Sequence, residues 1–143
     1  MTVRTWAPLV PELTCTDLQA SLVFYREFLG FEVLYERAED GFAYLQLGQA
    51  QLMLEQGFEG WLTGPMERPF GRGLNLQIEV ADARELAERL ERHRVSLYRD
   101  CRTAWYRDGA IEHGQVEFLV QDPDGYLLRF IEPVGERPVD MID

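Results

Sequence analysis

The sequence predicts an α+β fold made of two similar halves, each with one strand, one helix and then three further strands. Three observations support this prediction. Several short segments alternate apolar and polar residues, which is typical of half-buried strands. Two other segments carry apolar residues at helical spacing directly after an aspartate, Asp17 in the first half and Asp82 in the second. Because one such unit buries little apolar surface alone, the two units are expected to pair.

In the first half, a strand predicted over residues 9–16 leads into a helix capped by Asp17. The apolar residues of this helix recur three or four positions apart and stop before Gly30: Leu18, Leu22, Tyr25, Phe28 and Leu29. Three strands are predicted next, over residues 31–37, 42–47 and 51–56. Asp40-Gly41 and Gly48-Gln49 provide turn residues between them.

The second half repeats this order. A cleanly alternating strand over residues 74–80 precedes a helix over residues 83–93, which Asp82 caps and in which Leu86 and Leu90 face inward. Strands are predicted over residues 95–102, 115–120 and 126–131. Asp108-Gly109 repeats the turn at Asp40-Gly41, and Asp122-Pro-Asp-Gly125 closes a final hairpin.

The chain of 143 residues, 46% of them hydrophobic, is the size of a single domain with a proper core. We expect module one over about residues 8–57, a loop over residues 58–73, module two over about residues 74–132 and a loose polar tail over residues 133–143. The loop is rich in Gly and Pro but carries apolar anchors, which include Phe58, Trp61 and Phe70.

The formal net charge is −11, with 14 Lys plus Arg against 25 Asp plus Glu. A nucleic-acid partner is disfavoured, since binding phosphates requires a basic surface. The negative charge serves either solubility or the attraction of a cationic ligand. No apolar segment is long enough to span a bilayer and no signal peptide is evident, so we expect a cytoplasmic protein with no membrane partner. Cys15 and Cys101 lack metal-ligand spacing and are expected to be reduced thiols.

Two segments resemble the vicinal oxygen chelate superfamily, which includes glyoxalases, extradiol dioxygenases and bleomycin-resistance proteins. The string Phe118-Leu-Val-Gln-Asp-Pro-Asp-Gly-Tyr-Leu-Leu-Arg-Phe130 resembles the closing hairpin of the family. Residues 9–31, with Phe24-Tyr25 and Leu29-Gly-Phe31, resemble its opening strand and helix. The two motifs occur in the right order, and the resemblance spans about residues 8–132. It implies a single domain of paired βαβββ modules whose sheets curl around a cup-shaped cavity, and a homodimer with its cups between subunits.

Strand alternation predicts which side chains face this cup. The apolar residues of each strand must face the helix, which sends their neighbours to the opposite face. The side chains expected in the cup are Val10, Glu12, Thr14, Met53, Glu55, Asn75, Gln77 and Arg129. Gln51 and Glu79, near strand ends, are instead expected to be solvated. Glu12 and Glu55 could act as a carboxylate pair in acid–base chemistry, but nothing in their spacing makes them one, and only a raised carboxyl pKa would revive that idea.

Enzymes of the superfamily that this chain resembles hold a divalent metal through four strand residues, usually His or Gln and Glu. Carried over position by position, these sites fall on Val10, Glu55, Asn75 and Arg129, of which only Glu55 is a good ligand. Arg129 is a permanent cation that repels a metal and would pair more naturally with Glu55. His93 and His113 are expected at the surface, at a helix end and in a loop over residues 110–114. We therefore expect no metal and no cofactor.

The resulting hypothesis is a metal-free protein of the bleomycin-resistance type, which sequesters a small molecule and has no catalytic residues. A cationic glycopeptide antibiotic is the candidate ligand that the charge favours. Loop aromatics beside the cup are expected to stack on the ligand, or alternatively to anchor the core or an interface: Phe58, Trp61, Trp105 and Tyr106. Two alternatives remain, a metal-dependent glyoxalase-like or dioxygenase-like enzyme of the same superfamily and a dimeric ligand sensor or partner protein.

Overall fold

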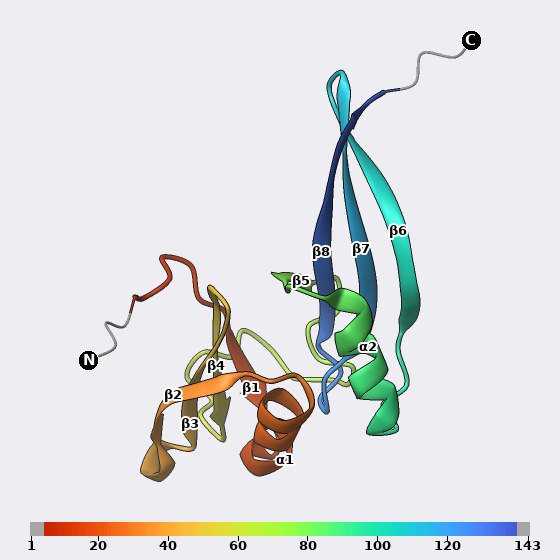
Figure 1. Cartoon of the computed structure of the whole chain (residues 1–143). Coiled ribbons are helices and arrows are strands. Elements are labelled where there is room, and N and C mark those ends of the chain that lie inside the picture. Colours follow the sequence, from red (N-terminus) through yellow and green to blue (C-terminus); the bar gives the residue numbers. More distant parts are fainter. Residues whose placement is uncertain (1–4, 140–143) are drawn as a thin grey trace. The chain divides into compact units, whose positions relative to one another are not determined.

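The computed structural model of the chain describes residues 5–139 and divides into two compact units. The first unit contains the chain up to Arg72 together with Asp122–Tyr126, and the second contains Gly73–Gln121 and the residues from Leu127 onward. Each unit has one four-stranded mixed sheet and one α-helix (Figure 1). The α+β class and the order of strand, helix and three strands in each half are therefore confirmed.

The sheet of the first unit has the order β1-β4-β3-β2. Its strands are β1 (Glu12–Cys15), β2 (Glu32–Arg37), β3 (Phe42–Leu47) and β4 (Ala50–Gln56). β1 runs parallel to β4, and the other pairs are antiparallel. One face is apolar and buried, where Leu13, Leu52 and Leu54 are each less than 4% exposed. This alternation follows from the period of two that the sequence carries.

The helical segment of the first unit begins as predicted but changes its winding. Asp17 caps α1 (Leu18–Leu22) by accepting the Ala20 N–H at 3.2 Å. Residues Val23–Phe28 then form wider π-helical turns, η1, in which the Leu29 N–H bonds to the Phe24 carbonyl. The wider turn is accompanied by burial of two consecutive aromatic side chains, Phe24 and Tyr25, which a regular apolar stripe would not predict.

The sheet of the second unit has the order β5-β8-β7-β6. Its elements are β5 (Asn75–Glu79), α2 (Ala83–Arg92), β6 (Arg99–Asp108), β7 (Ile111–Gln121) and β8 (Leu127–Pro138). α2 contacts β6, β7 and β8 and buries Leu86 and Leu90. Phe118 and Phe130, stacked at 5.4 Å between ring centroids, are completely buried on the apolar face of this sheet. Asp82 caps α2 by accepting the Glu85 N–H at 3.0 Å, as predicted.

Three strands of the second unit are longer or later than predicted, and they extend well past β5 and α2 (Figure 1). β6 begins at Arg99 because the chain leaves α2 through Arg94, at φ 61°, with the Val95 N–H bonded back to Leu90. β7 begins at Ile111, so the predicted loop over residues 110–114 is wrong. β8 continues to Pro138, paired with β7, so the loose tail is wrong for residues 133–138. Residues 140–143 of that tail lie outside the described residues.

The turn Asp122–Tyr126 belongs to the first unit although it joins β7 to β8. Asp124 is only 1% exposed and accepts hydrogen bonds from the Thr16 hydroxyl at 2.7 Å and from Arg68 at 2.9 Å. Gly125 has φ 98°, and a Cβ there would lie 2.5 Å from the Pro69 side chain. The turn thus requires glycine at position 125. The carboxylate of Asp124 is buried together with the hydrogen-bond donors that compensate for its loss of solvent.

Cys15 and Cys101 are both free thiols, as predicted, and burial raises the pKa of Cys15 to about 11. Among residues 5–139, no helix has both the length and the apolar composition needed to cross a bilayer.

Candidate functional site

Glu12 and Glu55 lie on the same face of the first sheet, away from the helix. β1 and β4 pair so that Glu12 lies opposite Met53 and Thr14 opposite Glu55. Since the intervening leucines of both strands are buried in the core, these four side chains occupy the other face. All four were expected on this face, and the carboxyl groups of Glu12 and Glu55 interact there, although their spacing in the sequence did not predict a pair.

The electrostatics of Glu12 agree with this pairing. Glu12 is exposed as a residue, but partial desolvation of its carboxyl raises the pKa, and a hydrogen bond with Glu55 and the charge of that neighbour raise it further. A hydrogen bond from Trp61 and the positive charge of Arg37 act in the opposite direction, and the net pKa remains above the ordinary value. Two carboxyl groups this close favour either a shared proton or a cation between them.

A cavity of about 330 Å³ opens beside Glu12 within the first unit. The loop that follows β4 forms most of its wall, and the full lining is Glu12, Thr14, Trp61, Leu62, Thr63, Gly64, Pro65, Met66 and Tyr126. The indole of Trp61 is 68% exposed and meets Phe58 edge to face at 5.4 Å between ring centroids. The cavity thus combines an acidic group with an open aromatic ring and a thioether.

Aromatic rings continue along the same sheet face on β2 and β3. Tyr35 and Tyr44 stack at 5.3 Å between ring centroids, and Trp6 meets both edge to face, at 6.0 and 5.1 Å. The guanidinium of Arg37 lies 4.0 Å from the ring centre of Phe42. This face is therefore lined by aromatic rings, of which Phe42 and Tyr44 are buried and Trp6 is exposed, rather than by solvated polar side chains alone.

Gln51 is buried, so the expectation that it is solvated is wrong. It is 6% exposed and fixes the segment before β1 against the sheet, because its side chain bonds to the Ala7 N–H at 2.8 Å and the Thr5 carbonyl at 2.7 Å. The same amide accepts from the Tyr44 hydroxyl at 2.7 Å. A second, larger cavity of about 700 Å³ lies at this end of the sheet, lined by Thr5, Trp6, Ala7, Pro8, Glu32, Leu34, Gln46, Gly48, Gln49 and Gln51. It contains one carboxylate, Glu32, and no acidic pair.

In the second unit, Asn75, Gln77 and Arg129 lie together on the sheet face opposite α2. β5 pairs in parallel with β8, which places Gln77 directly opposite Arg129. The next pair on this face is Glu79 and Ile131, and Glu79 is exposed as expected. Val10, by contrast, precedes β1 in the first unit and is not part of either sheet.

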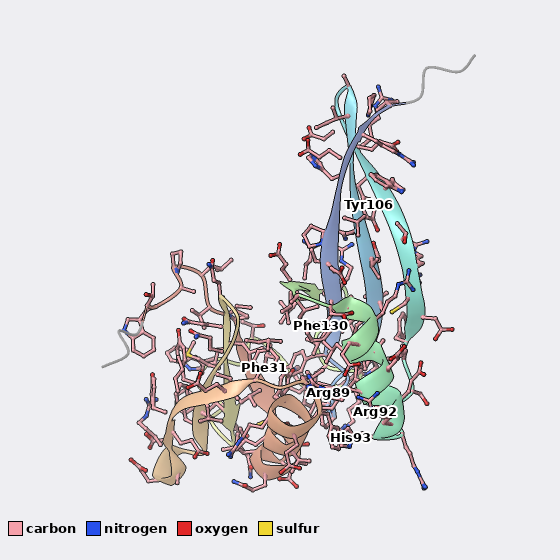
Figure 2. The ribbon with its side chains drawn as sticks, viewed as in Figure 1. Phe31, Arg89, Arg92, His93, Tyr106 and Phe130 are labelled. Carbon is pink, nitrogen blue, oxygen red and sulfur yellow. The ribbon has the colours of Figure 1, made fainter. Side chains whose placement is uncertain are left out.

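Trp105 and Tyr106 lie in β6, so the expectation that they belong to loops is wrong. Their neighbours in the register are Gly114 and His113 of β7, and they point to opposite faces of the sheet. Tyr106 lies on the face that carries Arg129 and donates a hydrogen bond to Glu117, which is only 2% exposed. Figure 2 shows Tyr106 in the part of the sheet that extends past α2. Trp105 lies on the other face, with the Arg137 guanidinium 4.0 Å from its ring centre.

Sequence reasoning missed Arg37 and Glu117. Extending the alternation across the first hairpin would have placed Arg37 opposite Phe42 on the Glu55 face. The same alternation in β7, where Val116 and Phe118 face the helix, would have placed Glu117 on the Arg129 face. In both cases the alternation of side chains along paired strands, rather than the residue type, would have identified the residue.

The residues at the expected metal positions do not fit a metal site. Val10 offers no donor atom, Arg129 is a cation, and Asn75 has only an amide oxygen. A divalent site generally keeps at least three protein ligands. Within residues 5–139, no cluster of three or more His, Cys, Asp or Glu side chains is placed to hold a metal ion.

Comparison with known proteins identifies the family to which a chain with this fold and site belongs. Residues 8–130 match the model of the Glyoxalase/Bleomycin resistance protein/Dioxygenase superfamily, and the chain belongs to this family. It is 27% identical over 138 residues to a bleomycin resistance protein of Geobacillus stearothermophilus, covering 87% of this chain and 96% of that protein. It is 29% identical over 122 residues to a lactoylglutathione lyase of Neisseria meningitidis serogroup A, covering 81% and 83%.

Among solved structures, TioX from Micromonospora sp. ML1 has the same fold, with a TM-score of 0.70. The two chains are 18% identical, and the match covers 89% of this chain and 98% of TioX.

Proposed function

We propose that the protein binds a cationic small molecule on the Glu12–Glu55 face without a metal ion and sequesters it, as expected for a protein of the bleomycin-resistance type. The observation that carries this proposal is the close pair of carboxyl groups beside the exposed Trp61 ring. A cation between the two carboxylates relieves their mutual repulsion, and the indole adds cation–π attraction.

The ligand class follows from the same features. The residues that line the 330 Å³ cavity include no Lys or Arg. The net charge of −11 also favours association with positive ligands at a distance. A glycopeptide such as bleomycin combines positive charge with planar and sugar groups that aromatic rings can cover. The relative named a bleomycin resistance protein supports this choice of probe.

We place the protein in the cytoplasm as a homodimer, and Asn75, Gln77 and Arg129 of the second sheet are further candidate ligand-binding residues. The exposed apolar side chains of the loop after β4, Phe58, Trp61 and Met66, are the surfaces that a second subunit or the ligand would cover. A sedimentation experiment at micromolar concentration that gives a monomer contradicts the dimer.

The proposal is tested by titration calorimetry of the dialysed protein with metal-free bleomycin. We expect heat of binding and a change in Trp fluorescence, with an affinity that falls between low salt and about 0.15 M salt, where charges separated by more than roughly 8 Å are screened. Absence of both signals at high micromolar bleomycin rules out this drug. The same titration with other cationic antibiotics then decides whether any cation is bound.

An enzyme of the same superfamily is the competing function, as in the relative named lactoylglutathione lyase. Elemental analysis distinguishes the two. After incubation with nickel, zinc, manganese and iron followed by dialysis, we expect less than stoichiometric metal; one retained metal per chain would overturn the binding function and favour the enzyme.

A further inference from the structure

Arg129 is a strand residue whose charge has no ion-pair partner among the described residues of its own unit. Its Nε atom is shielded from solvent and has no hydrogen-bond acceptor. In the described part of the second unit, the ion pairs involve Arg92, His113 and Arg137 instead. Since a shielded guanidinium N–H without an acceptor is unfavourable, this position is poised for an acceptor that comes from elsewhere.

The register of the sheet shows what surrounds this guanidinium. Residues directly opposite one another across the strands form rows on the face that carries Arg129. The row of Arg129 is Gln77, Arg129, Leu119 and Arg99. The row on the side of the β7–β8 turn is Asn75, Leu127 and Gln121. Neither row contains a carboxylate, and together they contribute two guanidinium groups and three amides.

Among the described residues, the acidic side chains of this face nearest to Arg129 are in the following row, with Glu79 and Glu117 on either side of Ile131. Farther along the face, Asp108 and Glu136 pair with His113. Glu117 already accepts hydrogen bonds from Tyr106 and from the Gln115 amide, the latter at 3.3 Å. Both bonds go to Oε1 of Glu117, and among the described residues no ion pair joins this carboxylate to Arg129. The chain is strongly acidic, yet this part of the face is locally positive and rich in N–H donors.

We propose that Arg129, flanked by Gln77 and Asn75, forms a subsite for an oxyanionic group of the ligand, a carboxylate or a phosphate. The planar guanidinium presents parallel N–H donors that match two oxygens of either group, and the amide of Gln77 can donate across the strand pair. The inference rests on the proposed function and adds to it: the face of the second sheet binds an acidic group, whereas the Glu12–Glu55 face of the first sheet binds a cation.

The subsite is tested with inorganic phosphate and with acetate, each followed by the NMR signal of the Arg129 Nε–H group in ¹⁵N-labelled protein. We expect a saturable shift of this signal, assigned by its loss in Arg129→Gln, whereas the signals of exposed arginines such as Arg92 of α2 (Figure 2) stay in place. Gln77→Ala keeps the guanidinium and is expected to weaken anion binding by about threefold, the loss of one modest hydrogen bond. A response to phosphate but not to acetate assigns a phosphate group, and the reverse assigns a carboxylate.

One control separates this subsite from an internal ion pair. If Glu55 supplied the missing acceptor, Glu55→Gln would shift the Arg129 signal with no anion added; that result, or no response to tens of millimolar of either anion, overturns the proposal. Arg92→Gln is the matched variant that removes an arginine charge from the opposite side of the sheet. Because no cationic ligand enters this titration, failure to bind bleomycin and failure to bind an anion are distinguishable.

Discussion

The hydroxyl of Tyr25 donates a hydrogen bond of 2.8 Å to Oδ2 of Asp122, and Tyr25 is completely buried. Oδ1 of the same carboxylate accepts the N–H groups of Asp124 at 2.9 Å and Tyr126 at 3.0 Å. Burial raises the pKa of Asp122, while these three hydrogen bonds lower it. The helix of the first unit is thus tied to the turn between β7 and β8 through one buried carboxylate.

Replacing Tyr25 by Phe removes the donor and leaves Oδ2 of Asp122 buried without it. We expect the free energy of unfolding to fall by about 1 to 3 kcal/mol, the usual cost of a buried polar group that loses its partner. Urea denaturation measures this loss. Tyr98→Phe is the matched control, since Tyr98 is 60% exposed and its substitution should change stability little. Equal stability of the two variants would show that the Tyr25 hydroxyl contributes nothing.

Trp61 is expected to contribute stacking area to the ligand. Its indole is 68% exposed and lines the cavity beside Glu12, so Trp61→Ala should weaken bleomycin binding by about 1 to 3 kcal/mol. Trp105→Ala is the comparison, because Trp105 lies against Gly114 and Arg137 on the sheet face opposite Arg129. We expect this second variant to retain the affinity. Calorimetry in which the Trp105 variant, and not the Trp61 variant, loses binding would move the site to the second unit.

His113 should make the extended part of the second sheet sensitive to pH. Nε2 of its ring lies 2.7 Å from Asp108 and Nδ1 lies 3.3 Å from Glu136, and the hydrogen bond with Asp108 is the main cause that raises its pKa. Because the folded pKa is the higher one, the protonated ring stabilises the fold below the ordinary histidine pKa, and this contribution is lost as pH rises through the folded value.

The check is the free energy of unfolding of the wild type and of His113→Gln at about pH 5.5 and about pH 8.5. The difference between the two proteins should be larger at the lower pH. An NMR titration should give a pKa for His113 above 6.5. A difference that is the same at both values of pH would mean that the ion pairs to Asp108 and Glu136 do not persist in solution.

Much of the fold could be predicted because local signals agreed with the tertiary structure. Asp17 and Asp82 cap the two helices, and the alternation in β4 and β5 sets their buried faces. The length of β8 could not be read from residues 133–138, because the strand there is held by pairing with β7 rather than by an apolar pattern. The π-helical turns over Val23–Phe28 could not be predicted either, because the spacing of apolar residues does not show where a helix changes its winding.

The candidate site was predictable only in part, for a related reason. Alternation within a strand placed Glu12, Glu55, Gln77 and Arg129 on the faces away from the helices, as the registers have them. Arg37 and Glu117 were missed because the same alternation was not extended across the first hairpin and along β7, where it places both on these faces. Gln51 was misjudged because its partners, Thr5 and Ala7, lie 46 and 44 residues away in the sequence.

The claim that the Glu12–Glu55 pair binds a cation directly is tested best by the bleomycin affinity of Glu55→Gln. This substitution removes one negative charge and keeps the shape of the side chain, so we expect binding about tenfold or more weaker, the usual worth of a charge-assisted contact. Glu59→Gln, an exposed residue of the adjacent loop, is the matched control and should bind as the wild type does. Wild-type affinity in both Glu55→Gln and Glu12→Gln would contradict the account, because the ligand would then bind without the acidic pair.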